Sequence, residues 1–227
     1  MKTNYYAKHL SAIRLKKCYE IGSARIQQYL EAEIQFTLSH IHPNDYVLEL
    51  GCGYGRILSR IAEKAEIAYG IDNSKNNIAL AQSFLKKYDN ARLFLMDARN
   101  LEFPDKTFDV VIGIQNAISA LKIEPKLLII EALRVTKENG LVILSSYAEH
   151  FWEERLQWFV DQSKAGLLGE IDWKKTGNGV IKCEGGFIAT SFYQKDFAAL
   201  LSEMSLNGEI LVVDDSSVFC IIKKVNH

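Results

Sequence analysis

Three glycines follow a short apolar segment and form the pattern G-x-G-x-G at Gly51, Gly53 and Gly55. Glycine has no Cβ, so such a loop lets the backbone approach a ligand closely and adopt positive φ angles. A dinucleotide-binding loop, G-x-G-x-x-G, would need a glycine where this chain has Arg56. Glu49 precedes the loop, and its carboxylate suits an ammonium-bearing ligand while repelling a pyrophosphate. The loop therefore indicates a nucleotide-like ligand with positive charge; the alternative is a tight turn that needs glycine only for packing.

Two aspartates stand where later apolar segments end. Asp72 can accept hydrogen bonds from both hydroxyls of a ribose, as the acidic residue of dinucleotide-binding folds does. Asp97 is followed by the small Ala98, a pair that can present a carboxylate and a backbone N–H to the edge of an adenine ring. The alternatives are a helix cap or strand end for Asp72 and a turn residue for Asp97. We favour the ligand-binding interpretation because the aspartates follow the glycine loop in the expected order.

The elements that must position these residues alternate between short apolar strands and amphipathic helices. Such alternation predicts a mostly parallel sheet with helices on both faces, which binds ligands beyond the carboxyl ends of its strands. An Asn-Gly pair at 139–140 is expected to stop the last helix of this region. The predicted strands are 46–50, 67–71, 92–96, 108–114 and 141–145, and the predicted helices are 56–64, 73–88 and 124–137.

The segments that flank this region follow other patterns. Residues 8–41 have helical periodicity and predict an N-terminal helical cap over 1–43, followed by the main domain over 44–227. Within that domain, residues 148–193 predict an insertion on the substrate side, with a helix over 149–165 and β-rich structure over 171–193. After a helix over 194–204, strands over 209–213 and 218–223 predict a hairpin at the sheet edge.

The glycine loop, Asp72 and the Asp97-Ala98 step together resemble the class I S-adenosylmethionine-dependent methyltransferases. The resemblance covers residues 44–147 and implies a Rossmann-like, doubly wound sheet of seven strands, whose antiparallel last strand would be residues 218–223. It also implies S-adenosylmethionine as the methyl donor and S-adenosylhomocysteine as the product. By this resemblance the glycines pack against the methionine moiety, Asp72 binds the ribose and Asp97 lies at the adenine. The cofactor-binding residues it implies are Glu49, Gly51, Cys52, Gly53, Asp72, Asn73, Asp97, Ala98, Ile114 and Gln115.

The segment 113–119 bears on the methyl acceptor. It lacks the N/D-P-P-Y/F tetrad of enzymes that methylate exocyclic amines of bases, and it resembles small-molecule methyltransferases of the glycine N-methyltransferase type. We therefore expect methyl transfer to an N or O nucleophile of a small molecule. Gln115 and Asn116 either face the transferring methyl group or cap the following helix. The alternative functions are a protein or RNA methyltransferase and a non-catalytic S-adenosylmethionine-binding protein.

Several aromatic and titratable residues are further candidates for the acceptor side. Tyr147 and His150 follow the fifth predicted strand, and His150 has a suitable unperturbed pKa for a general base, although a surface histidine is the commoner case. Asn116, Tyr6 and Trp152 are candidate substrate contacts, and residues 1–20 form either a lid or a frayed terminus. For the nearby Trp158 and Phe159, the spacing favours packing over a substrate cage.

The composition of the chain bears on its expected partners and location. The net charge of −1 provides no basic field for a phosphate backbone, so we expect no nucleic-acid partner. No apolar run reaches the length of a membrane span, and the four cysteines form no C-x-x-C pair, so we expect neither a membrane segment nor a metal site. The chain is expected to be a cytoplasmic monomer or homodimer that acts on a small molecule.

Overall fold

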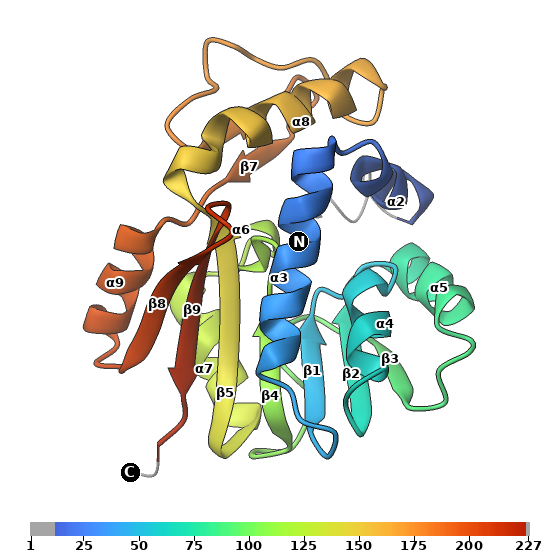
Figure 1. Ribbon diagram of the computed structural model, residues 1–227, viewed down its shortest axis with the longest axis vertical. Helices are drawn as coiled ribbons and strands as arrows, with labels where there is room; N and C mark the ends of the chain where they lie inside the picture. Colours follow the sequence, from blue (N-terminus) through green and yellow to red (C-terminus); the bar gives the residue numbers. More distant parts are fainter. Residues whose placement is uncertain (1–11, 226–227) are drawn as a thin grey trace.

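The computed structural model describes residues 12–225 and is built around a seven-stranded sheet (Figure 1). Five neighbouring strands are parallel, and β9 runs antiparallel to both β5 and β8. This arrangement confirms the predicted doubly wound fold with an antiparallel last strand. The sheet order is β3-β2-β1-β4-β5-β9-β8, with β1 Tyr46–Leu50, β2 Ile67–Asp72, β3 Ala91–Leu95, β4 Phe108–Gly113, β5 Thr136–Tyr147, β8 Gly208–Val213 and β9 Ser217–Lys223.

Helices cover both faces of the sheet (Figure 1). Helices α3 (Ala24–Ser39), α4 (Arg56–Ala62) and α5 (Lys75–Phe84) bury apolar residues against one face. Helices α7 (Pro125–Val135) and α9 (Gln194–Glu203) contribute to a second buried cluster, and the short α6 (Ala117–Ala120) follows β4. The central strands β1 and β4 are mostly apolar and almost wholly buried, because both of their faces are covered.

The described part of the N-terminal segment forms two helices within the helical stretch 8–41 that the sequence predicted. Helix α2 (Ile13–Glu20) ends before Gly22, and α3 begins after Ser23, whose hydroxyl accepts a hydrogen bond from Ile26 N at 3.3 Å. This N-cap satisfies a backbone donor at the start of α3 and lets the chain change direction. Helix α3 packs against α4 and α8, so the predicted division of the chain between residues 43 and 44 stays a prediction.

The Asn-Gly pair at 139–140 does not end a helix, which corrects the sequence prediction. Helix α7 ends at Val135, and Asn139 lies within β5 with a φ of 65°. The backbone N–H of Asn139 donates to Lys224 O at 2.8 Å, and the pairing of β4 with β5 changes register between Phe108 and Val110. The Asn-Gly pair therefore forms an irregularity inside a longer strand. The hydrogen bond to Lys224 O satisfies the Asn139 N–H there without a helix.

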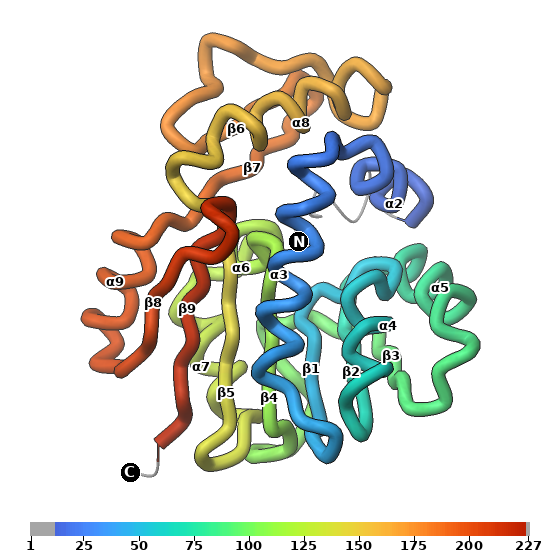
Figure 2. Tube along the Cα trace, in the orientation of Figure 1, coloured from blue at the N-terminus to red at the C-terminus, as the bar shows by residue number. Residues whose placement is uncertain are grey.

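A separate layer lies beyond the carboxyl ends of the parallel strands (Figure 2). It contains the short helix η1 (Glu149–Phe151), helix α8 (Trp152–Lys164) and a two-stranded sheet of β6 (Val180–Lys182) and β7 (Ile188–Thr190). Helix α2 is tied to this layer, because Arg14 donates to the carbonyl oxygens of Gly166 and Leu167 at 2.7 and 2.9 Å. The layer and α2 together form a roof over the sheet edge where the candidate residues lie.

Candidate active site

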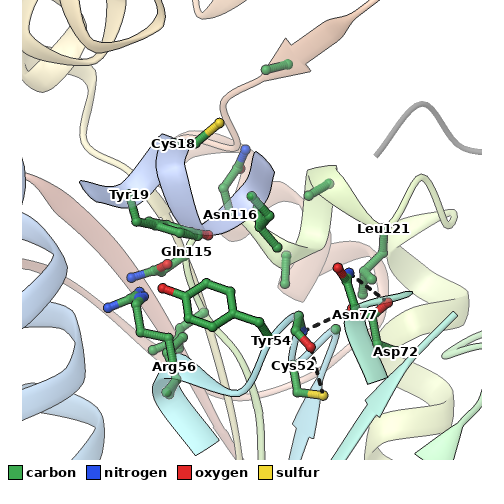
Figure 3. A pocket seen from close by; sticks show the side chains of 18 of the residues that line it. Cys18, Tyr19, Cys52, Tyr54, Arg56, Asp72, Asn77, Gln115, Asn116 and Leu121 are labelled. Atoms are coloured by element: carbon green, nitrogen blue, oxygen red, sulfur yellow. Dashed lines mark hydrogen bonds between the residues drawn. The ribbon is translucent and has the colours of Figure 1, made fainter. Parts of the chain in front are cut away.

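A cavity of about 180 Å³ lies between the carboxyl ends of the strands and this roof (Figure 3). Its floor comes from the loop after β1 and from the ends of β2 and β4. Its walls come from α2, α6, α8 and the β6–β7 region. The predicted cofactor-binding residues that line it are Glu49, Gly51, Cys52, Gly53, Asp72, Asn73, Ile114 and Gln115.

The glycine loop presents its backbone to the cavity. Gly51 and Gly53 have φ angles of 74° and 56°, a region that side-chain-bearing residues rarely adopt. A Cβ on Gly51 would lie 3.0 Å from Leu121 Cδ2, and one on Gly53 would lie 3.1 Å from Leu15 Cδ2. Both leucines line the cavity, so added Cβ atoms would take up space between the loop and its cover. The requirement for glycine here is both conformational and steric.

Asp72 holds the glycine loop in addition to facing the cavity. Its Oδ2 accepts a hydrogen bond from Gly53 N at 3.0 Å, and its Oδ1 accepts from Ser74 N at 2.8 Å and Asn77 Nδ2 at 3.1 Å. Burial raises the pKa of this carboxyl above its usual value, and the three hydrogen bonds oppose that shift. A carboxylate offers about four acceptor positions, so Asp72 retains capacity for a ligand hydroxyl.

Asp97 and Ala98 line a smaller hollow beside the main cavity. The two hollows share four lining residues, Gly51, Asp72, Asn73 and Leu121. The carboxylate of Asp97 is partly exposed and pairs with Arg99 at 2.6 Å, and this contact lowers its pKa. The structure thus places the predicted adenine-side residues next to the predicted ribose residue, along one sheet edge.

Glu49 is buried at the floor of the cavity with an unpartnered oxygen, Oε2. Burial raises its pKa to about 8, and the nearby positive charge of Arg56 opposes the shift. Arg56 also lines the cavity, and its guanidinium carbon lies 4.7 Å from the centroid of the Tyr19 ring (Figure 3). One of its nitrogens, Nη2, is likewise buried without a partner. The cavity therefore holds a buried carboxylate and a guanidinium with hydrogen-bonding capacity left for a ligand.

The segment after β4 is a strained turn held by the neighbouring strand. Gln115 and Asn116 have φ angles of 54° and 63°. Gln115 N donates to Ser145 Oγ at 2.8 Å, and Ser145 Oγ donates to the buried carboxylate of Glu33 at 2.7 Å. The amide of Asn116 is used within the protein: its Oδ1 accepts from Ser146 Oγ and its Nδ2 donates to Thr190 O, both at 2.8 Å. Gln115 Nε2, in contrast, is buried without a partner.

Some of the remaining predicted acceptor-side residues line the cavity and others do not. Tyr147 and Asn116 line the cavity. The side chain of His150 is 60% exposed, 3.8 Å from Asp215, and is not part of the cavity wall, so the structure gives no support to its prediction as a base. Trp152 also lies outside the wall and packs near the guanidinium of Arg155. Tyr6 lies outside the described residues.

Sequence reasoning missed much of the roof. Trp158 and Phe159, interpreted as packing residues, line the cavity together with Gln162, and so do Tyr19 from α2 and Phe187 from the insertion. The available signal was the spacing of Trp158, Phe159 and Gln162, which places all three on one side of a helix. That spacing identifies a buried face without saying what the face covers.

The described residues contain neither a cluster of metal ligands nor a membrane-spanning helix. Across residues 12–225, no three His, Cys, Asp or Glu side chains come together in a way that could hold a metal ion. Within the same range, no helix combines the length and the apolar character needed to cross a membrane.

Comparisons with known proteins agree with the geometry. Residues 47–140 match a family model described as a methyltransferase domain. A probable cobalt-precorrin-6B C(15)-methyltransferase (decarboxylating) of Methanococcus maripaludis is 35% identical over 116 residues, 48% of this chain and 64% of the relative. A demethylmenaquinone methyltransferase of Bacillus licheniformis is 33% identical over 133 residues, 55% of each chain. This chain thus spans less than two thirds of the length of these relatives.

Structural comparison gives the same fold. A putative S-adenosyl-L-methionine-dependent methyltransferase from Methanococcus maripaludis aligns with a TM-score of 0.66 and 16% identity, over 93% of this chain and 92% of that protein. This likeness shows that the two proteins share a fold, and the methyltransferase-domain model matches less than half of this chain. The matched residues 47–140 contain the glycine loop, Asp72 and Asp97.

Proposed function

We propose that this protein binds S-adenosylmethionine in the cavity and transfers its methyl group to a small-molecule acceptor. The proposal rests mainly on the cavity floor. There a Glu49 carboxylate oxygen without a hydrogen-bond partner is buried, and Gly51 and Gly53 line the cavity with no side chain to cover their backbone. A ligand with an ammonium group and a flexible methionine chain suits this floor, since a buried carboxylate needs a charged or hydrogen-bonding partner.

The other lining residues fit the same donor. Asp72 has an acceptor position left for a ribose hydroxyl, and the hollow at Asp97 and Ala98 continues from it along the sheet edge. Arg56 Nη2 is an unpartnered donor, which suits the carboxylate of the methionine moiety. When bound, S-adenosylmethionine supplies an electrophilic methyl group on a sulfonium, a good leaving group that needs no acid.

The protein's own part in such a reaction is mainly positioning. The turn at Gln115 and Asn116 is held by Ser145 and Ser146, so this wall keeps its shape when a ligand arrives. The roof of α2 and α8 excludes water and orients the acceptor along the line of displacement. Of the two predicted catalytic residues, Tyr147 lines the same space and His150 does not. The cytoplasmic location and the monomeric or homodimeric state stay predictions.

Metabolite extracts incubated with the protein and S-adenosylmethionine labelled in its methyl group test the proposal. We expect release of S-adenosylhomocysteine together with one labelled small molecule, identified by mass spectrometry. Label found in RNA or protein fractions would contradict the small-molecule acceptor. Donor binding without turnover in any extract would contradict methyl transfer and indicate a binding protein.

A further inference from the structure

The cavity has two chemically different ends. Among the described lining residues, every charged side chain belongs to the floor around the glycine loop: Glu49, Arg56 and Asp72. The rest of the described wall is apolar, aromatic or neutral and polar. If the proposed donor occupies the charged end, the acceptor occupies the uncharged one.

A row of aromatic rings leads from Tyr19, which contacts Arg56 of the floor, to the uncharged end of the cavity. The ring centroids of Tyr19 and Trp158 are 6.0 Å apart, those of Trp158 and Phe159 are 5.9 Å apart, and those of Phe159 and Phe187 are 5.7 Å apart. Trp158 Nε1 donates to Cys18 O at 2.8 Å, so its polar atom is already used and fixes the ring in place. Such a surface favours a flat apolar ligand, because aromatic side chains gain most from contact with other rings.

One neutral polar group stands among these rings. Gln162 lies on α8 three residues after Phe159, is 4% exposed and lines the cavity. Its side-chain amide makes no hydrogen bond to any residue of the described range 12–225. An amide both donates and accepts, so it suits a hydroxyl, carbonyl or amine on a ligand and cannot neutralise a charge.

Arg155 lies behind this wall. It is fully buried, donates to Gly179 O at 3.0 Å and Ser191 Oγ at 2.9 Å, and faces the rings of Tyr147, Trp152 and Phe159. Because none of its surface is accessible, it cannot contact a ligand carboxylate without rearrangement. Two of its nitrogens, Nε and Nη2, have no hydrogen-bond partner but are buried. Its charge opposes a cation in the cavity and attracts an anion, but an anion there would have no direct contact with the guanidinium.

We infer that the methyl acceptor is an uncharged molecule with a flat, aromatic-sized apolar body and a hydrogen-bonding group that meets Gln162. This inference rests on the proposed function, because that function assigns the charged end to the donor. The aromatic wall holds the body of the acceptor, and the Gln162 amide sets its orientation.

Calorimetry on the wild-type protein saturated with S-adenosylhomocysteine tests the inference with three matched probes: naphthol, naphthoate and naphthylmethylammonium, at a pH near neutrality. Naphthol should bind at least about tenfold more tightly than either charged analogue, since each charge would be buried without a partner. Equal or tighter binding of naphthoate or naphthylmethylammonium, or no binding of naphthol, would overturn it. If S-adenosylhomocysteine itself fails to bind, the proposed function fails first, which distinguishes the two results.

A pair of glutamines on the same helix provides the matched variants. Gln162→Leu should weaken naphthol binding by about three- to tenfold, which is the usual net contribution of one hydrogen bond. The same variant should leave the affinity for S-adenosylhomocysteine unchanged. Gln157→Leu is the control, because Gln157 is exposed and bonds to Asp161 on the helix surface. Equal effects of the two variants on naphthol would overturn the role of Gln162.

Discussion

At the scale of single residues, the burial of Glu49 determines its charge, and its charge affects which ligand it can bind. Its carboxyl is buried beside the glycine loop, its pKa is raised to about 8 by that burial, and one of its oxygens lacks a partner. At neutral pH the group is therefore largely protonated in the free protein. An ammonium group bound nearby favours the ionised form, because opposite charges at short range lower the pKa of an acid.

This linkage predicts proton release when S-adenosylhomocysteine binds near pH 7, with affinity that rises as pH increases toward about 8. Titration calorimetry in buffers of different ionisation enthalpy measures the released proton. Glu49→Gln should abolish the release, and Glu31→Gln, on the exposed face of α3, should retain it. A wild-type protein that binds without proton release would contradict the role given to Glu49.

Ser145 makes a second residue-scale prediction, on stability. Its hydroxyl donates to Glu33 and accepts from Gln115 N inside the protein. Ser145→Ala leaves both partners buried and unsatisfied, so it should lower the free energy of unfolding by about 1–3 kcal/mol in urea denaturation. Ser83→Ala removes a hydroxyl bonded on an exposed helix surface and should change it by less than about 0.5 kcal/mol. Similar effects from both variants would show that the buried network contributes little.

At the scale of elements, α2 is part of the site and not only a flanking segment. Leu15, Cys18 and Tyr19 line the cavity, and α2 is tied to the roof by the hydrogen bond from Trp158 to Cys18 O and by those from Arg14. Helix α3 has its own N-cap at Ser23, so its start does not depend on the preceding residues. The lid predicted for residues 1–20 stays a prediction, and residues 1–11 of it lie outside the described residues.

Deletion of residues 1–20 should weaken S-adenosylhomocysteine binding by about tenfold or more, because it removes one wall and admits water. Arg14→Met keeps the helix and removes its ties to Gly166 and Leu167, so it should produce a smaller loss. Binding calorimetry measures both. Unchanged affinity after the deletion would show that α2 is not a functional wall.

The floor and the roof of the cavity differ in how far the sequence predicts them. The floor was predictable, because Gly51, Asp72 and Asp97 lie where predicted strands end, and parallel strand ends share one edge of the sheet. The roof was not, because Tyr19 and Trp158 meet only after segments about 140 residues apart pack together. His150 was predicted from its chemistry and its place after the fifth strand, and in the structure its side chain is exposed.

At the scale of the whole molecule, the two buried glutamates determine how stability depends on pH. Burial raises the pKa of Glu33 to about 7 and that of Glu49 to about 8, while both would titrate near 4.5 in the unfolded chain. Between these values the native state holds more protons than the unfolded state, so stability falls as pH rises. Carboxyls with lowered pKa values, such as Glu131, are ionised in both states above about pH 5 and do not oppose this trend.

The ligand-free protein should therefore lose unfolding free energy on the order of 6 kcal/mol between about pH 5 and pH 8. Urea denaturation across this range measures the slope. A double variant, Glu33→Gln with Glu49→Gln, should show a much flatter profile. A wild-type stability that rises over the same range would contradict the burial of two protonated carboxyls.

The central claim is that the cavity floor binds S-adenosylmethionine through Asp72 and the glycine loop. Titration calorimetry with S-adenosylhomocysteine tests it most directly, comparing the wild type with Asp72→Asn and with the control Asp161→Asn, at a half-buried residue that does not line the cavity. We predict one site per chain, affinity at least about tenfold lower in Asp72→Asn because a charged hydrogen bond is lost, and no change in the control. Absence of saturable binding to the wild type, or equal affinity in Asp72→Asn, would contradict the account.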